Sequence, residues 1–140
     1  MQFISTDCVQ LNQFYKKNKD KARAKPGDLM FAALNDHGQI CAALRLLPYP
    51  GFFFLRSVFT HPQQRGKGIA STLIQHAIHT QINSAQGLPI YTLPTESAFP
   101  LYQRLGFTSI KQAQIPAELL ASYRRFKQSS KGPTVMVLQP

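Results

Sequence analysis

Residues 64–71 read Gln-Arg-Gly-Lys-Gly-Ile-Ala-Ser, and no other stretch says more about the fold and chemistry of this chain. The stretch lies between an extended apolar run, Phe52–Thr60, and a run with helical periodicity, Thr72–Gln81. A strand, a glycine-bearing turn and a helix in this order can cradle a phosphate, because the free N–H groups at the helix start point at the anion. Gly66 and Gly68 lack a Cβ, so the backbone there can approach a ligand closely.

The turn alone fits more than one kind of site. A Walker phosphate loop requires a glycine, four further residues and then Gly-Lys-Ser/Thr, and this spacing is absent. A dinucleotide-binding turn requires a third glycine where Ser71 stands. In the remaining alternative, Arg65 and Lys67 belong to a solvent-exposed basic turn whose glycines serve backbone geometry alone.

Two longer stretches narrow these alternatives. Residues 58–70 read VFTHPQQRGKGIA, and residues 98–107 read AFPLYQRLGF. The first resembles the acetyl-CoA-binding motif of the GNAT N-acetyltransferase superfamily, with Arg65, Gly68 and Ala70 at its three defining positions. The second is similar to that family's tyrosine-bearing helix, which ends in Gly-Phe. The resemblance implies an enzyme that moves an acetyl group from acetyl-CoA directly to a primary amine of a small molecule or peptide.

The element pattern predicts one domain over residues 1–140. Strands are predicted at Gln2–Ser5, Leu29–Leu34, Gln39–Leu47, Phe52–Thr60, Ile90–Leu93, Phe107–Gln114 and Thr134–Leu138. Helices are predicted at Val9–Lys17, Gly66–Gln81, Ser97–Leu105 and Pro116–Phe126, and a polar loop at Gln128–Pro133. Antiparallel strands followed by strand–helix–strand units predict an α/β (α+β) fold, with a mixed, mainly antiparallel central sheet and helices on both faces. The resemblance implies the same architecture.

The resemblance also implies where coenzyme A would bind. The backbone of Val58, Phe59 and Thr60 is expected to pair with the pantetheine arm, although ordinary sheet pairing is the alternative. An N–H near Phe59 is expected to polarise the thioester. The pyrophosphate is expected on the turn residues Arg65, Gly66, Lys67, Gly68, Ile69, Ala70 and Ser71. Thr95 stands where the family often has an asparagine that contacts the cofactor. No metal is expected.

Acetyl transfer requires a neutral amine, a stabilised oxyanion and a proton for the leaving thiolate. Tyr102 matches the family's usual general acid, although its spacing also fits an aromatic packed on an amphipathic helix. The base is less clearly marked, because no Asp or Glu occurs between Gly38 and Gln86. Glu96 is the best acidic candidate, although a carboxylate that favours a helix N-terminus is an equal reading. More remote candidates are Asp28, Glu118 and His61.

The acceptor is marked only by arginines and aromatic residues. Arg45 and Arg56 lie on neighbouring predicted strands, with Tyr49 and a run of phenylalanines between them. We therefore consider an acceptor that bears a carboxylate or phosphate beside its amine. The predicted helix over residues 116–126 would form one wall and bring Tyr123 and Arg124 near. Core aromatics and solvent-facing arginines are the alternative interpretation.

The charge of the chain leaves a different class of function open. Sixteen Lys and Arg residues against six Asp and Glu give a formal net charge of +10, which attracts anions. No recognition-helix, zinc-finger or RNA-binding signature accompanies this charge. Three hypotheses remain: an N-acetyltransferase, an acyl-CoA-binding module without turnover, and a basic nucleic-acid or ribosome-associated protein.

The compartment is predicted from cysteines and hydropathy. Cys8 and Cys41 are expected to be free thiols in a reducing cytoplasm. No signal peptide is evident, and no apolar stretch reaches the ~20 residues that a membrane span requires. A homodimer is compatible with the sequence.

Overall fold

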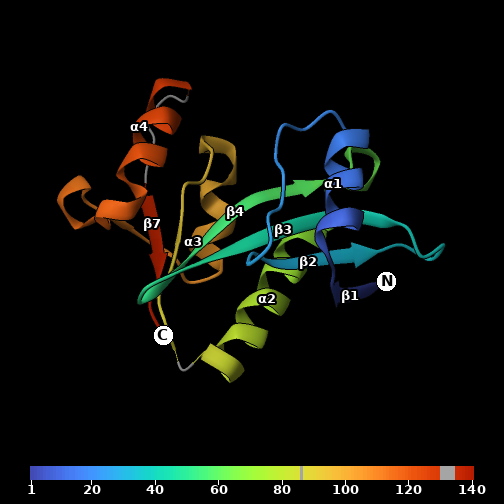
Figure 1. Ribbon diagram of the computed structural model, residues 1–140, viewed down its shortest axis with the longest axis horizontal. Helices are drawn as coiled ribbons and strands as arrows, with labels where there is room; N and C mark the ends of the chain where they lie inside the picture. Colours follow the sequence, from blue (N-terminus) through green and yellow to red (C-terminus); the bar gives the residue numbers. More distant parts are fainter. Residues whose placement is uncertain (86, 130–134) are drawn as a thin grey trace.

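The computed structural model describes residues 1–85, 87–129 and 135–140, and it is built on one seven-stranded sheet (Figure 1). The strands are β1 (Gln2–Ser5), β2 (Leu29–Leu34), β3 (Ile40–Tyr49), β4 (Phe52–Thr60), β5 (Ile90–Thr92), β6 (Thr108–Ile110) and β7 (Val135–Leu138). They lie in the order β1-β2-β3-β4-β5-β7-β6. β4 and β5 pair in parallel, and every other pair within the described sheet is antiparallel. The predicted mixed, mainly antiparallel sheet is confirmed.

Helices cover both faces of this sheet, as predicted. α2 (Ile69–Ala85) and α3 (Phe99–Arg104) pack on one face, and α1 (Cys8–Lys17) and α4 (Leu120–Ser129) pack on the other. The alternation of side chains along β4 serves both layers, because Phe53 and Leu55 join the core under α2 while Phe52 and Phe54 join the core under α4. Short 3-10 turns connect the elements: η1 (Pro62–Gln64), η2 (Glu96–Ala98), η3 (Gln112–Gln114) and η4 (Ala117–Leu119). None of the helices in the described residues is long and apolar enough to cross a membrane.

Three predicted helices begin later than expected. The helix predicted from Ser97 begins within the 3-10 turn η2, and α3 starts only at Phe99. α2 starts at Ile69 rather than Gly66, because Gly66 and Gly68 have φ of +82° and +76°, outside the right-handed helical region. The helix predicted from Pro116 begins as the 3-10 turn η4, and only then continues as α4. The polar loop predicted over residues 128–133 and the first residue of the last predicted strand fall largely outside the described residues.

The strand predicted over residues 107–114 is wrong in length. β6 covers only Thr108–Ile110. Immediately after it, the Lys111 N–H donates to Oε1 of Gln114 at 2.9 Å, and the chain folds into η3. A local side-chain acceptor therefore replaces the cross-strand partner that a longer strand would need.

The sheet opens between β4 and β5. Their pairing ends where Leu55 lies opposite Thr92, but β4 continues to Thr60. The Thr92 hydroxyl donates to the Leu55 carbonyl at 3.1 Å and closes the last paired position. Beyond this point, which we call the fork, β4 has no strand partner on its β5 side among the described residues. Main-chain groups of β4 are therefore free to bind a ligand.

Candidate active site

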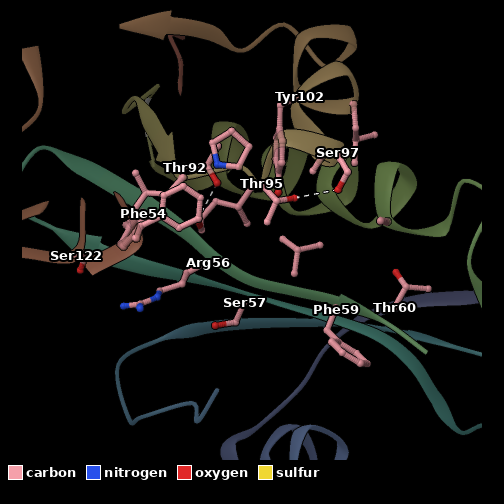
Figure 2. Close-up of a pocket in the computed structure, with 18 of the residues that line it drawn as sticks. Phe54, Arg56, Ser57, Phe59, Thr60, Thr92, Thr95, Ser97, Tyr102 and Ser122 are labelled. Atoms are coloured by element: carbon pink, nitrogen blue, oxygen red, sulfur yellow. Dashed lines mark hydrogen bonds between the residues drawn. The ribbon is translucent and has the colours of Figure 1, made fainter. Parts of the chain in front are cut away.

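A cleft of about 740 Å³ lies at the fork (Figure 2). It is lined by the open half of β4, by the segment that links β5 to α3, by α3 itself and by α4. Figure 2 shows Tyr102 reaching from α3 towards Thr95, whereas Arg56 extends to the other side, towards Ser122 of α4. Since α3 and α4 cover opposite faces of the sheet, the cleft can be approached from both faces.

Main-chain groups of β4 face the cleft beyond the fork. The His61 N–H donates to the Cys41 carbonyl of β3 at 2.8 Å. Groups on one edge of a strand recur at every second residue, so the Phe59 N–H also points towards β3. The N–H and C=O groups of Val58 and Thr60 then face the opening. In this register the Phe59 N–H itself points away from the cleft, and the N–H groups near Phe59 that face the opening are those of Val58 and Thr60. That one of them polarises a thioester stays a prediction.

The turn after β4 offers a row of unsatisfied donors. Among the described residues, the N–H groups of residues 66–71 have no acceptor, and the Thr72 N–H is the first to bond back, to the Gly68 carbonyl at 3.1 Å. Gly66 and Gly68 hold positive φ angles, and a Cβ at either position would meet open space. The turn therefore points free N–H groups into space that a ligand can fill, as an anion site at a helix start requires.

The basic side chains of the turn also have defined places. Arg65 lines the cleft, donates from Nε to the Thr60 carbonyl at 2.9 Å, and lies over the Phe59 ring at 5.3 Å. The Lys67 Nζ bonds Gln64 at 3.3 Å. Arg65 thus links the turn to the end of β4 at the lining of the cleft.

A bulge at Ser57 sets the course of β4 beyond the fork. Ser57 has φ of +60°, which is rare for a residue other than glycine, and the β3–β4 register shifts at this point. The Tyr15 hydroxyl donates to the Ser57 carbonyl at 2.7 Å. Arg45 donates from Nη2 to the Ser57 hydroxyl and from Nη1 to an Asp28 carboxylate oxygen, each at 2.9 Å. This buried network holds a conformation that serine alone would not favour.

The network changes the interpretation of Arg45. Its side chain is 8% exposed and that of Asp28 is 10% exposed, so the two form a buried ion pair. Arg45 also lies outside the cleft lining, whereas its register partner Arg56 is exposed and lines it. The prediction that both arginines face an acceptor is therefore wrong for Arg45.

Tyr102 lies where the fork and the cleft meet. Its side chain is only 5% exposed and packs edge-on against Phe107, with ring centroids 5.3 Å apart. Burial raises the pKa of Tyr102 to about 12, and a hydrogen bond with the Thr92 side chain partly offsets this effect. Tyr102 therefore belongs to the core and to the cleft lining at once. At neutral pH its phenol is protonated and can donate a hydrogen bond.

None of the carboxylates in the described chain lines the cleft. Glu96 is exposed at the start of η2, next to the cleft-lining Thr95, and its assignment as a base stays a prediction. Of the more remote candidates, Asp28 is held by Arg45, and Glu118 is exposed in η4. The His61 Nδ1 accepts a hydrogen bond from the Gln63 N–H at 3.1 Å, away from the cleft.

The remaining predicted cofactor residues divide into two groups. Val58, Phe59, Thr60, Arg65, Ala70 and Thr95 line the cleft. Gly66, Lys67, Gly68, Ile69 and Ser71 adjoin it without lining it. Ile69 is buried in the core, so it can contribute only its main chain. The Thr95 hydroxyl lies 3.3 Å from the Ser97 hydroxyl, which adds a second hydroxyl beside the position that the sequence marked (Figure 2).

The helix predicted to form one wall does line the cleft, as α4, but through other residues than predicted. Ser122, Arg125 and Phe126 line the cleft, whereas the predicted Tyr123 is buried in the core and Arg124 is exposed outside the lining. The three lining residues have the i, i+3, i+4 spacing of one helix face. That spacing was the available signal.

Solved structures share this fold at low sequence identity. The ribosomal-protein-S18-alanine N-acetyltransferase from Escherichia coli matches with a TM-score of 0.74 and 15% identity, over 99% of this chain and 92% of its own. Rv2747 from Mycobacterium tuberculosis, solved in complex with CoA and NLQ, matches with a TM-score of 0.72 and 14% identity, over 100% and 99% of the two chains. Spermidine N-acetyltransferase SpeG from Vibrio cholerae, as an F149A mutant, gives 0.71 and 13%, over 99% and 95%.

Sequence comparison matches this chain to a protein family but to no curated protein. Curated protein sequences include no significant match to this chain. Residues 26–109, more than half of the chain, match the acetyltransferase (GNAT) domain family. This range contains β2 to β5, the glycine turn, α2, α3 and Tyr102. The chain therefore belongs to the GNAT acetyltransferase family.

Proposed function

We propose that this protein is an acetyl-CoA-dependent N-acetyltransferase that acts on a primary amine of a small molecule or peptide. One observation carries the proposal. At the fork, unpaired main-chain groups of β4, unsatisfied N–H groups of the adjoining glycine turn and the Tyr102 phenol all belong to one continuous region. An acyl thioester on a long, polar, phosphate-bearing carrier needs these three kinds of group.

The proposed donor runs along β4. The pantetheine arm takes up the Val58 carbonyl and the Thr60 N–H, which β5 leaves unpaired, because the Thr60 carbonyl already accepts a hydrogen bond from Arg65. The pyrophosphate takes the N–H groups of residues 66–71, with Arg65 beside it. The thioester then lies at the fork, where the Val58 N–H can donate to the carbonyl oxygen as negative charge develops there.

The reaction itself is a direct displacement. The neutral amine attacks the thioester carbon, the new C–N bond forms, the C–S bond breaks, and the amine's proton ends on the departing thiol. Tyr102 is proposed to donate a hydrogen bond to the departing sulfur. With a pKa of about 12 it binds its proton more tightly than a free thiol, whose pKa is about 8.5. The proton that the thiol keeps is therefore the one released by the amine.

The lack of described carboxylates in the cleft affects the protonation state of the acceptor amine. Arg56, Arg65 and Arg125 give the cleft a positive potential, because each lines it and no described carboxylate does. Nearby positive charge disfavours an ammonium and lowers the pKa of a bound amine. We propose that this effect supplies neutral amine without a dedicated base. Glu96, beside Thr95, is kept as the alternative proton acceptor.

The same lack of described carboxylates favours a second candidate, an acyl-CoA-binding module without turnover. Both candidates predict that acetyl-CoA stabilises the protein against heat, because a ligand that binds only the folded state raises the melting temperature. A basic nucleic-acid-associated protein predicts no such shift. The two cysteines are free thiols, in keeping with the reducing cytoplasm that we propose as its compartment.

Thiol release across a panel of amines separates the two candidates. We expect wild-type protein with acetyl-CoA to release free thiol with at least one amine. Tyr102→Phe should lower kcat by about 100-fold, the loss typical of removing one hydrogen-bond donor to charge that develops in the transition state, with the Kd for acetyl-CoA unchanged. Stabilisation by acetyl-CoA without thiol release for any amine would favour the binding module, and no stabilisation would remove both candidates.

A further inference from the structure

The end of the cleft at α4 has its own chemistry. We call it the arginine end and define it as Arg56, Ser122 and Arg125. The Arg56 guanidinium lies over the Phe54 ring, with Cζ 5.6 Å from the ring centroid, and it extends towards Ser122 (Figure 2). Arg125 donates from Nη2 to the Ser122 hydroxyl at 3.3 Å. Both arginines are exposed, so their donors are open to a ligand from solvent.

The arginine end carries positive charge without a counter-charge. Arg45, on the neighbouring strand, is paired with Asp28. Arg56 and Arg125 have no carboxylate partner within the described residues. Partial burial lowers the pKa of Arg56, and the charges of Arg45 and Arg125 lower it further. These cations therefore repel one another, and an anion placed between Arg56 and Arg125 would relieve that repulsion.

The proposed donor cannot supply this anion. Arg56 lies four residues before Thr60 along β4, and an extended strand rises about 3.3 Å per residue, so about 13 Å separate the two positions. The turn that would hold the pyrophosphate lies further on, beyond η1. A pyrophosphate seated on residues 66–71 leaves Arg56 unpaired. The anion must therefore belong to the acceptor, which reaches the fork from the α4 face.

We propose that the acceptor is an amine that also carries a carboxylate or phosphate, and that this anion is held between Arg56 and Arg125. This proposal rests on the proposed function for the amine, while the anion site itself stands on the arginines. A guanidinium presents paired donors that match either oxyanion. The anion anchors the acceptor at the arginine end and leaves its amine free to reach the fork.

The test compares pairs of acceptors in which one member carries the anion and the other has a neutral group in its place. L-Phenylalanine is paired with L-phenylalaninamide, because Phe54 and Phe126 line the same end, and O-phosphoethanolamine is paired with ethanolamine. Each compound is titrated calorimetrically into the protein with CoA present and absent. Each is also assayed for thiol release from acetyl-CoA. The variants are Arg56→Gln and Arg125→Gln. Arg124→Gln is the matched control, because it removes an exposed arginine on the same helix outside the cleft lining.

We expect at least one anionic compound to bind about tenfold more tightly than its neutral partner, as one charge-assisted contact suggests. Whichever pair shows the preference identifies the carboxylate or the phosphate as the anion. Arg56→Gln and Arg125→Gln should each remove most of the preference, and Arg124→Gln should retain it. Equal binding within both pairs, no binding of either anion, or the same loss in Arg124→Gln would overturn the proposal. Anion preference without any thiol release would instead count against the proposed function alone.

Discussion

The two ends of the cleft are made from different parts of the chain. At the turn end, residues 58–60 and 66–71 offer mainly main-chain N–H and C=O groups. At the arginine end, the side chains of Arg56, Ser122 and Arg125 do the binding that we propose. The turn end is contiguous in the sequence, whereas the arginine end combines β4 with α4, more than sixty residues later.

Because of this difference, the two ends should respond to different kinds of substitution. A site made of main-chain groups depends on backbone conformation and tolerates many side-chain changes away from the glycines. A site made of side chains depends on charge and on which helix face is presented. Substitutions at one end should therefore leave binding at the other end unchanged. Substitutions in the buried network of Asp28, Arg45 and Ser57 should instead lower the stability of the whole protein.

The largest effect is expected beneath the turn end, at the buried ion pair. Asp28→Ala would leave Arg45 buried without a counter-charge and would loosen the bulge at Ser57. Removing one partner of a buried pair typically costs about 3–5 kcal/mol. Urea denaturation should show a fall of that size in the free energy of unfolding. Asp36→Ala is the control, because the Asp36 side chain is 94% exposed, and a similar fall there would contradict this assignment.

A smaller effect is expected from the backbone of the turn itself. Gly68→Val forces a β-branched residue to φ of +76°, which costs about 1–3 kcal/mol, and places a side chain in the space proposed for the pyrophosphate. Calorimetry should show the affinity for acetyl-CoA falling by about 100-fold, equivalent to ~2.7 kcal/mol.

The control for this variant is Gly38→Val. Gly38 has φ of +74° and open space in the β2–β3 hairpin, so it carries the same strain far from the cleft. It should reduce stability without changing the affinity for acetyl-CoA. An equal loss of affinity in both variants would mean that strain alone explains the result.

Between the two ends, Tyr102 should make the protein sensitive to alkali. Because the folded state raises the pKa of Tyr102 from 10.0 to about 12, the folded state binds more protons than the unfolded state between these values. Stability is therefore complete below pH 10 and should fall by about 2 kcal/mol as the pH rises to 12. Denaturation at several pH values should show a shallower fall in Tyr102→Phe. Identical slopes would refute this assignment of the alkaline transition.

The smallest effect is expected at the hydroxyl of the arginine end. Ser122→Ala removes a neutral hydrogen-bond partner of Arg125 but no charge. A single such bond is worth about 0.5–1.5 kcal/mol, so KM for the preferred acceptor should rise by about threefold, with KM for acetyl-CoA unchanged. Steady-state kinetics with each substrate varied in turn would check this. A larger change in KM for acetyl-CoA than for the acceptor would contradict the assignment of the two ends to different substrates.

The contrast also explains what could be predicted from the sequence. The glycine turn could be predicted because strand, turn and helix follow one another and Gly66 and Gly68 occupy the positive-φ positions. Tyr102 could be predicted only through the family resemblance. Its spacing equally fits a core aromatic, and the structure shows that Tyr102 packs in the core and also lines the cleft, while its role in catalysis stays a proposal.

The arginines could not be assigned in the same way. Arg45 and Arg56 lie opposite each other in the sheet. Arg45 is buried rather than exposed because it pairs with Asp28, which comes from a turn distant in the sequence. Choosing Arg125 over Arg124 requires the phase of α4, because one residue turns a helix by about 100°. The spacing of residues 122, 125 and 126 marks one helix face, but the sequence alone does not say which face of α4 turns towards the cleft.

The most direct test of the central claim is amide hydrogen exchange, followed by NMR with and without acetyl-CoA. The N–H groups of Val58, Thr60 and residues 66–71 face the opening or have no acceptor in the described structure. If they hold the donor, acetyl-CoA should slow their exchange strongly and leave the amides of α4 unchanged. Protection confined to α4, with residues 58–71 exchanging as fast as before, would contradict the account.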